Sequence, residues 1–269
     1  MSTAESLDQY RKLYDELHEP LGLTTPIEVV AADWWYFDQR PDRETIIVSV
    51  PPYHPDLAAP VFVHYMGHAK LLQDGWPRMK ASVGCTEEVA QYLATLPEEK
   101  RTSVPLYWAS RSEDSFFDFF VWRHVTKQLG ADWLERWMNA ASYSTTEKLL
   151  PLFDTGASVG LDIHRYVYSL DWFGSLSSLA ELYQFPVLAK LETQYEAVKA
   201  LDSWGEDFRQ AIHETLPWLR TFYRTLAERF PSHFELLRDE KVRDEVFHEY
   251  YDTIWEDLPL EIQAVFKNE

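Results

Sequence analysis

The stretch from Pro60 to Gly75 constrains the fold of this chain more than any other, because it is largely apolar and yet contains two histidines. Proline is tolerated in the first turn of a helix and glycine commonly follows the last, so the two residues predict a helix between them. His64 and His68 then lie on one face of that helix. Two imidazoles on an apolar helix need polar partners if they are buried, and one metal ion would serve both.

Gly67 lies between the two histidines, at a position where glycine weakens a helix. Its presence indicates that something approaches the helix backbone closely, and we expect the metal site to account for this. Catalytic zinc commonly takes two imidazoles, a carboxylate and an open position. The spacing is equally compatible with a simpler alternative, in which His64 and His68 are buried core residues of an unrelated helical protein.

Composition narrows the class of protein and of partner. Only 9 glycines among 269 residues, together with long apolar-periodic stretches, favour helices over a turn-rich all-β fold. A formal charge of −19 makes nucleic acid an unexpected partner. No long apolar run predicts a membrane span, and no signal peptide is recognisable, so we expect a cytoplasmic protein without membrane association. The single cysteine, Cys85, excludes an internal disulfide and a cysteine-rich zinc site.

Local patterns predict an α+β protein in which a small sheet near the N-terminus is followed mostly by helices. Strands are expected where β-branched and aromatic residues run together, and helices where apolar residues recur with helical spacing. A polar segment between two prolines is expected to be a loop. The predicted strands are 27–36 and 45–50, the loop is 97–105, and the helices are 5–19, 60–75, 87–96, 113–129, 131–142 and most of 150–269.

The segment Val61–Leu71 resembles the active-site helix of zincin metallopeptidases, in which the two histidines of the HExxH motif bind zinc. The strand predicted at 45–50 and its connection to Pro60 are similar to the edge strand and connection of those enzymes. The resemblance covers about residues 27–140. It departs from the family at Tyr65, which stands where the family has a glutamate.

Residues 105–120 resemble the second helix of the gluzincins, where a tryptophan precedes a Ser-Glu-Gly-x-Ala element whose glutamate binds zinc. Ser112 and Glu113 match the start of that element, whereas Asp114 replaces its glycine and a phenylalanine fills the small-residue position. The resemblance therefore implies a zinc site made by the two histidines and Glu113.

Two further carboxylates are candidates for a role in this zinc site. Asp114 is an alternative ligand, and Asp118, four residues later on the same helical face, is an alternative ligand or an outer acceptor for an imidazole N–H. These acidic residues also fit a helix N-terminus that is stabilised by the helix dipole alone. His124 faces another direction, and we expect it to be a packed or surface histidine.

Tyr65 changes the chemistry that the resemblance implies. The zincin glutamate accepts a proton from the zinc-activated water, and a phenol with a pKa of about 10 is protonated at neutral pH. Losing a general base costs about 10²–10⁴-fold in rate. Tyr65 is instead expected to stabilise an oxyanion or to contact substrate, while Glu87, Glu88 or His54 would be the base in a divergent enzyme.

These observations predict a zincin-like metallopeptidase domain over residues 1–148, with a small mixed sheet and an active-site helix, and a mostly helical C-terminal region over 149–269. Two functions stay open. One is a divergent zinc-dependent peptidase or amide hydrolase with impaired or altered catalysis. The other is a catalytically inactive pseudopeptidase that acts as a binding or interaction protein. Either takes a peptide or protein as substrate or partner, and the oligomeric state is not determined by these patterns.

Overall fold

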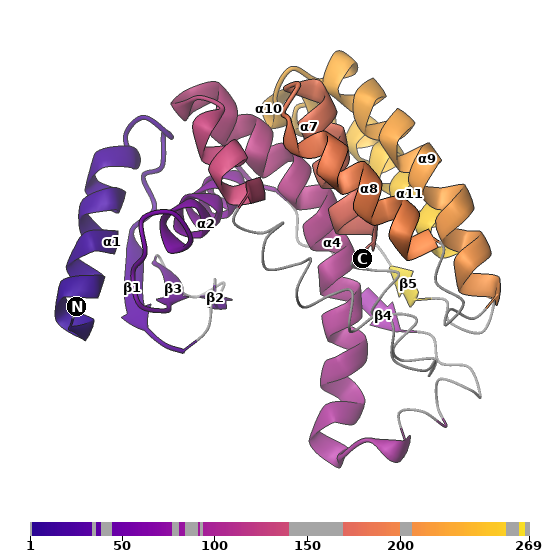
Figure 1. The fold of residues 1–269 in the computed structure, drawn as a ribbon, viewed down its shortest axis with the longest axis horizontal. Coiled ribbons are helices and arrows are strands. Elements are labelled where there is room, and N and C mark those ends of the chain that lie inside the picture. The colour runs from indigo at the N-terminus through magenta and orange to yellow at the C-terminus, as the bar shows by residue number, and fades with distance from the viewer. Residues whose placement is uncertain are drawn as a thin grey trace. The chain divides into compact units, whose positions relative to one another are not determined.

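The computed structural model describes residues 2–33, 36–38, 45–76, 81–83, 91, 94–139, 169–199, 206–256 and 264–266 (Figure 1). The chain divides into two compact units, each assembled from segments that are distant in sequence. The first unit contains Met1–Pro77, Phe120–Ser144 and Ser232–Phe234, and the second contains Arg78–Phe119, Thr145–Pro231 and Glu235–Glu269. The boundary predicted between residues 148 and 149 lies outside the described residues.

Helix α1 opens the first unit and spans Thr3–Leu17. Its N-cap is Ser2, whose hydroxyl accepts from the backbone N–H of Glu5 while the Glu5 carboxylate accepts from the backbone N–H of Ser2. This reciprocal pair satisfies two donors that the first turn leaves free. The helix buries Tyr10 and Leu13, which confirms the amphipathic helix predicted over 5–19.

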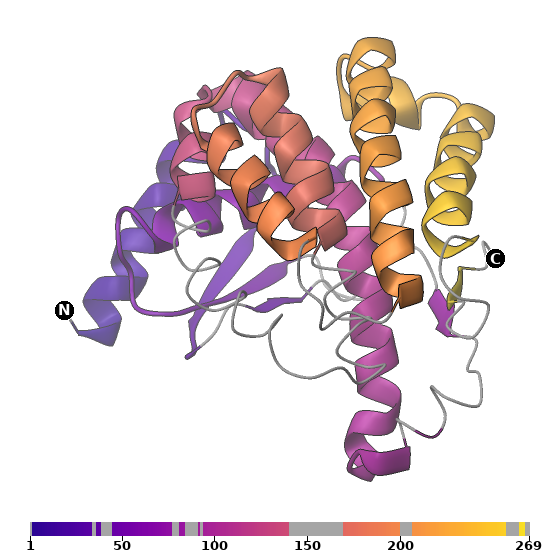
Figure 2. The same cartoon turned by 45° about the vertical axis from the view of Figure 1, so that its right-hand side comes forward.

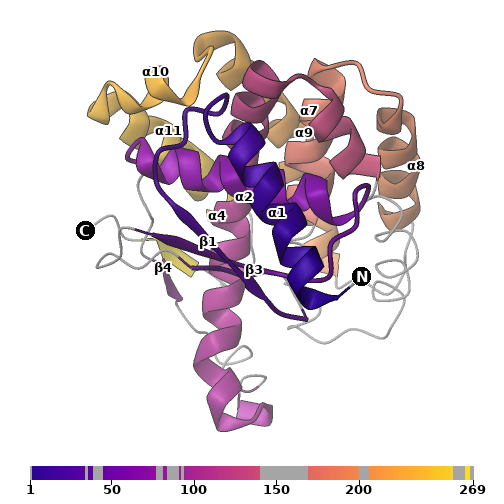
Figure 3. The ribbon, with the colours of Figure 1, turned by 90° about the vertical axis from the view of Figure 1, so that its left-hand side faces the viewer.

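A small mixed sheet lies beside α1 (Figure 3). Its strands are β1 (Ile27–Ala31), β2 (Tyr36–Asp38) and β3 (Ile46–Val50), in the order β1-β3-β2. β1 pairs with β3 in parallel and β2 pairs with β3 in antiparallel fashion. The single strand predicted over 27–36 is therefore wrong. The chain leaves β1 after Ala31 and reaches the other side of β3, a reversal that apolar composition does not reveal.

Helix α2 spans Ala58–Gln73 and confirms the helix predicted between Pro60 and Gly75. Asp74 caps its C-terminus, and Gly75 follows with a φ of +89°, the left-handed conformation that glycine adopts without strain. The Trp76 N–H then donates to the Leu71 carbonyl at 3.0 Å. This cap ends the helix sharply and turns the chain away from it.

Helix α4 spans Glu98–Leu129, so the loop predicted over 97–105 is wrong. Pro97 precedes the helix, where proline does no harm, and the glutamates, lysine and arginine that follow are good helix formers. Pro105 removes a single backbone hydrogen bond, which the rest of the long helix tolerates. The predicted stop at Gly130 is confirmed, with a φ of +94°, and residues 132–139 are again helical.

The described residues from 169 to 256 are mostly helical, as predicted for most of 150–269, and are drawn from orange to yellow in Figure 2. Close packing is visible at Gly174, where an added Cβ would lie 2.9 Å from Leu219 Cδ1. The helices in this part of the chain are η1 (Leu170–Leu176), α7 (Ser177–Leu182), α8 (Val187–Lys199), α9 (Glu206–Arg229), α10 (His233–Leu237) and α11 (Glu240–Glu256). A separate two-stranded sheet is formed by β4 (Ala81–Val83) and β5 (Ala264–Phe266). None of the described helices is both long enough and apolar enough to cross a membrane.

Candidate metal centre

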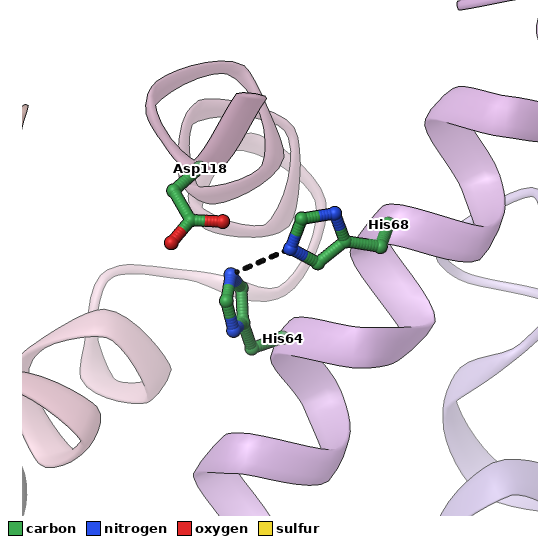
Figure 4. Close-up of side chains that lie close together, drawn as sticks. All are labelled: His64, His68 and Asp118. Atoms are coloured by element: carbon green, nitrogen blue, oxygen red, sulfur yellow. Dashed lines mark hydrogen bonds between the residues drawn. The ribbon is translucent and has the colours of Figure 1, made fainter. Parts of the chain in front are cut away.

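The two histidines of α2 are buried and lie side by side. His64 is 8% exposed and His68 is 7% exposed. Their ring centroids are 4.5 Å apart, and the two Nε2 atoms approach to 3.1 Å (Figure 4). The spacing of four residues thus brings the same nitrogen of each imidazole to one point, as the sequence predicted.

Asp118 of α4 brings a carboxylate to this point and is 3% exposed. One oxygen of Asp118 and one nitrogen of each histidine all lie within 4.8 Å of one another. In Figure 4 the carboxylate is directed from α4 toward the two rings of α2. We call these three residues the His-His-Asp cluster. Among the described residues, no other group of three or more histidine, cysteine, aspartate or glutamate side chains is placed to hold a metal ion.

The position of Asp118 follows from the face of α4 on which it lies. Val121, Trp122 and Val125 follow it at intervals of three, four and seven residues, and residues so spaced share one helical face. Trp122 stacks on His64, with ring centroids 5.1 Å apart and planes 7° apart. α4 therefore presents this face to α2, and the carboxylate lies one turn before the stacked tryptophan.

Gly67 marks a close approach of the two helices. A Cβ at this position would lie 2.6 Å from Val121 Cγ1 and 3.0 Å from Val125 Cγ2. The close approach inferred from this glycine is confirmed, but the group that approaches is α4, so the expectation that the metal site accounts for it is wrong. The glycine lets α4 come near enough for Asp118 to reach the histidines.

Aromatic rings surround the His-His-Asp cluster. The Trp137 ring lies 5.3 Å from that of His64, and Trp122 and Trp137 are 5.0 Å apart. The Tyr65 ring lies 5.8 Å from His64 and 6.1 Å from His68, measured between centroids. Such rings exclude water and lower the local dielectric, which strengthens every charge interaction inside the cluster.

The geometry fits a metal ion. In a tetrahedral zinc site with bonds of about 2.0–2.1 Å, neighbouring ligand atoms lie about 3.3 Å apart. The two Nε2 atoms are already 3.1 Å apart. The Asp118 oxygen lies within 4.8 Å, a separation that a small side-chain rotation shortens. Two neutral nitrogens and one carboxylate are also the donor set that divalent first-row metals prefer.

The carboxylate in the cluster is Asp118, which the sequence offered only as an alternative ligand or outer acceptor. Glu113, the residue implied by the resemblance, and Asp114 lie on α4, but their side chains fall outside the described residues. At 100° per residue, Glu113 is about 140° around the helix from Asp118, whereas Asp114 shares its face. Asp118 is the lone acid between pairs of phenylalanines, a pattern that predicts a buried carboxylate with a specific partner.

The remaining histidine candidates lie apart from the cluster. His124 is buried, as a packed histidine should be, and its Nε2 donates to the Leu21 carbonyl at 3.0 Å. The pKa of His124 is lowered to about 4, chiefly by burial and to a lesser extent by His233 and Lys70 nearby, although the hydrogen bond to Leu21 raises it. His54 is exposed before α2, where its Nδ1 accepts from the Asp56 N–H. Glu87 and Glu88 lie outside the described residues.

Comparisons with protein-family models, curated proteins and solved structures find no match for this chain. Its function has to be inferred from the residues of the His-His-Asp cluster and their surroundings.

Proposed function

We propose that this chain is a zincin-like metal-binding protein that holds a zinc ion through His64, His68 and Asp118. The activity we assign to the site is zinc-dependent hydrolysis of a peptide or amide bond, with catalysis altered by Tyr65. The observation that carries the proposal is the burial of two imidazoles and a carboxylate around one point.

Electrostatics supports a cation at this point. Desolvating a carboxylate that is 3% exposed costs several kcal/mol, and a cation beside the carboxylate offsets that cost. The ring nitrogens of neutral imidazoles are metal ligands, and the cluster brings one nitrogen of each histidine to the same point. A divalent cation compensates the carboxylate and satisfies both nitrogens in a single step.

Tyr65 determines what chemistry the site can perform. A zinc ion, when bound, polarises a substrate carbonyl and lowers the pKa of water. Tyr65 occupies the position next to His64 and lies beside both imidazoles. Its phenol donates a hydrogen bond but does not accept a proton at neutral pH, so it stabilises an oxyanion in place of acting as a general base. Hydrolysis without another base is slower by about 10²–10⁴-fold.

A second candidate is a pseudopeptidase that binds metal or a partner without turnover. Two observations favour it: the phenol at Tyr65 and the exposure of 8% or less of every member of the cluster. A peptide has to bring its carbonyl next to the metal to be hydrolysed, and buried ligands admit only small molecules in this conformation. The two candidates share the metal site and differ in turnover.

Metal analysis tests the shared site. Full-length protein purified without chelator should contain one zinc per chain, and the double substitution His64→Ala with His68→Ala should remove it. Asp118→Asn keeps the side-chain shape and should weaken zinc binding by at least about tenfold, because it removes the charged ligand. His213→Ala, at an exposed histidine of α9, is the matched control. Equal zinc in the double variant and the wild type would overturn the proposal.

Turnover separates the two candidates. Zinc-loaded protein should hydrolyse unstructured peptides slowly, and Tyr65→Phe should lower kcat with little change in KM because it removes only the phenol hydroxyl. If zinc binds and no peptide is cleaved by the wild type, the pseudopeptidase is the correct alternative.

A further inference from the structure

A second buried polar group lies at the C-terminal end of α2. The Asp74 carboxylate forms an ion pair with Lys70, and its other oxygen accepts a hydrogen bond from His233 Nε2 at 2.7 Å. The three side chains are 8%, 9% and 1% exposed, respectively. Burial by itself raises the pKa of Asp74, but the hydrogen bonds and charges of His233 and Lys70 outweigh it and lower the pKa, so the carboxylate is ionised.

His233 also contacts α4. Its ring packs edge-on against that of His124, with centroids 5.1 Å apart and planes 83° apart. His124 in turn donates to the Leu21 carbonyl. A single imidazole therefore contacts both the cap of α2 and a buried side chain of α4.

On both helices, these contacts follow the ligands of the His-His-Asp cluster by the same number of residues. Asp74 follows His68 by six residues on α2, and His124 follows Asp118 by six residues on α4. Six helical residues correspond to about 9 Å along each axis. His233 thus joins the two ligand-bearing helices on the C-terminal side of the metal ligands of each.

We propose that His233 is a positioning residue for the metal centre, which holds the C-terminal ends of α2 and α4 at the separation that the ligands require. The inference rests on the proposed function. His233 acts through the helices and touches no metal ligand. Its Nδ1 is buried without a hydrogen-bond partner in the described structure, an arrangement that stability alone does not favour.

The proposal makes the metal centre depend on the C-terminal half of the sequence. His233 belongs to Ser232–Phe234, a short segment of the first unit whose flanking chain on both sides belongs to the second unit. Phe234 adds to the attachment, because the Lys70 ammonium lies 5.2 Å from the centre of its ring. A residue 159 positions from Asp74 in the chain completes the support of the N-terminal site.

Two substitutions in the full chain separate a hydrogen bond from mere packing. His233→Phe keeps an aromatic ring against His124 but removes the donor to Asp74. His233→Gln keeps a donor near the position of Nε2. We expect His233→Phe to weaken the binding of Zn²⁺ and of Co²⁺ by about tenfold, as outer partners of metal sites do, and to change the visible spectrum of bound Co²⁺. His233→Gln and the control His213→Phe should bind as the wild type does.

A measurement on the wild type covers the case in which His233→Phe does not fold. Coupling between two sites is reciprocal, so Zn²⁺ should slow hydrogen exchange of the Asp74 and Gly75 amides at the α2 cap. Zinc binding by the wild type with no change at these amides would overturn the positioning role, as would equal affinity of His233→Phe and wild type, or equal loss in His233→Gln. A wild type that binds no zinc overturns the proposed function itself, and the positioning role with it.

Discussion

Residues 116–125 of α4, all buried except the half-buried Arg123, lie in two chemically different surroundings. In the second unit, Phe116 packs on Tyr250 with ring centroids 4.6 Å apart, and Phe119 packs on Tyr223 at 4.5 Å. In the first unit, Trp122 stacks on His64. The first surrounding is an aromatic core, whereas the second encloses ionisable groups. An aromatic core needs only shape and volume, but buried ionisable groups need particular partners.

This difference separates stability from function along one helix. Substitutions of α4 residues that face the aromatic core should change the free energy of unfolding whether or not metal is present. Substitutions of α4 residues that face His64 and His68 should change the free energy of unfolding mainly by weakening the binding of metal. The following predictions test that separation, in order of decreasing effect.

The largest effect is expected for Phe116→Ala. The side chain is 1% exposed and contacts Phe222, Phe247 and Tyr250. Its removal should lower the free energy of unfolding by about 3–5 kcal/mol, because it loses buried area and leaves a cavity. Denaturant melts with and without Zn²⁺ should give the same loss. Phe116→Leu is the milder control. A loss that depends on zinc would contradict the separation.

Zinc itself should stabilise the wild type by about 2.7 kcal/mol when its free concentration is a hundredfold above Kd. Asp118→Asn, with zinc binding at least about tenfold weaker, should reduce this gain to about 1.4 kcal/mol or less at the same zinc concentration, whereas Phe116→Leu should retain it. Thermal melts at several zinc concentrations measure the gain. If Asp118→Asn gains as much as the wild type, Asp118 is not a ligand.

Acid should destabilise the metal-free protein through His124. Its pKa is about 4 in the folded state, chiefly because of burial, against 6.5 unfolded. A group with a lowered folded pKa contributes stability above the unfolded pKa, and this contribution is lost as pH falls from 6.5 toward 4. Between pH 7 and 4.5 the loss should be about 2 kcal/mol.

Chelator-treated protein is needed for this measurement, because acid also releases metal from histidines. His124→Gln retains a donor for Leu21 but does not titrate in this range, so its stability should fall less between the two pH values. Equal pH dependence in both proteins would show that other groups dominate. The lowered pKa of Asp74 has the same effect on stability. The stability that its carboxylate contributes is also lost as the pH falls, but at lower pH than that of His124.

The smallest change in stability is expected for Gly67→Ala. The added Cβ has to displace Val121 and Val125, which costs roughly 1–3 kcal/mol, and the better helix propensity of alanine returns about 1 kcal/mol. We expect a net loss of about 1 kcal/mol. Zinc affinity should fall by about tenfold, since α4 moves away from α2 and takes Asp118 with it. Gly67→Ala with Val121→Ala makes room for the new methyl group and should restore zinc binding.

Local features were predictable wherever local chemistry determined them. Pro60 and Gly75 indicated the ends of α2, and Gly130 indicated the end of α4. The strand predicted over 27–36 was wrong because the reversal after Ala31 depends on pairing with β3. The loop predicted over 97–105 was wrong because the helix formers between Pro97 and Pro105 favour a helix more than the two prolines oppose it.

The candidate site was predictable in part. The i, i+4 spacing placed His64 and His68 together, because both lie on one helix. Helical spacing did not determine the carboxylate of the His-His-Asp cluster. The resemblance implied Glu113, and Asp118 remained an alternative. The pattern of one aspartate among phenylalanines was the signal for Asp118.

By itself the sequence determined the histidine pair, because a helix needs only local hydrogen bonds to place residues four apart on one face. Only the tertiary structure decided what meets that pair. The rotation of α4 selects Asp118, the contact of Gly67 with Val121 sets the distance between the helices, and His233 reaches Asp74 from 159 residues away. These depend on packing between elements that are distant in the chain, and a local pattern that indicates a buried residue does not identify the element that covers it.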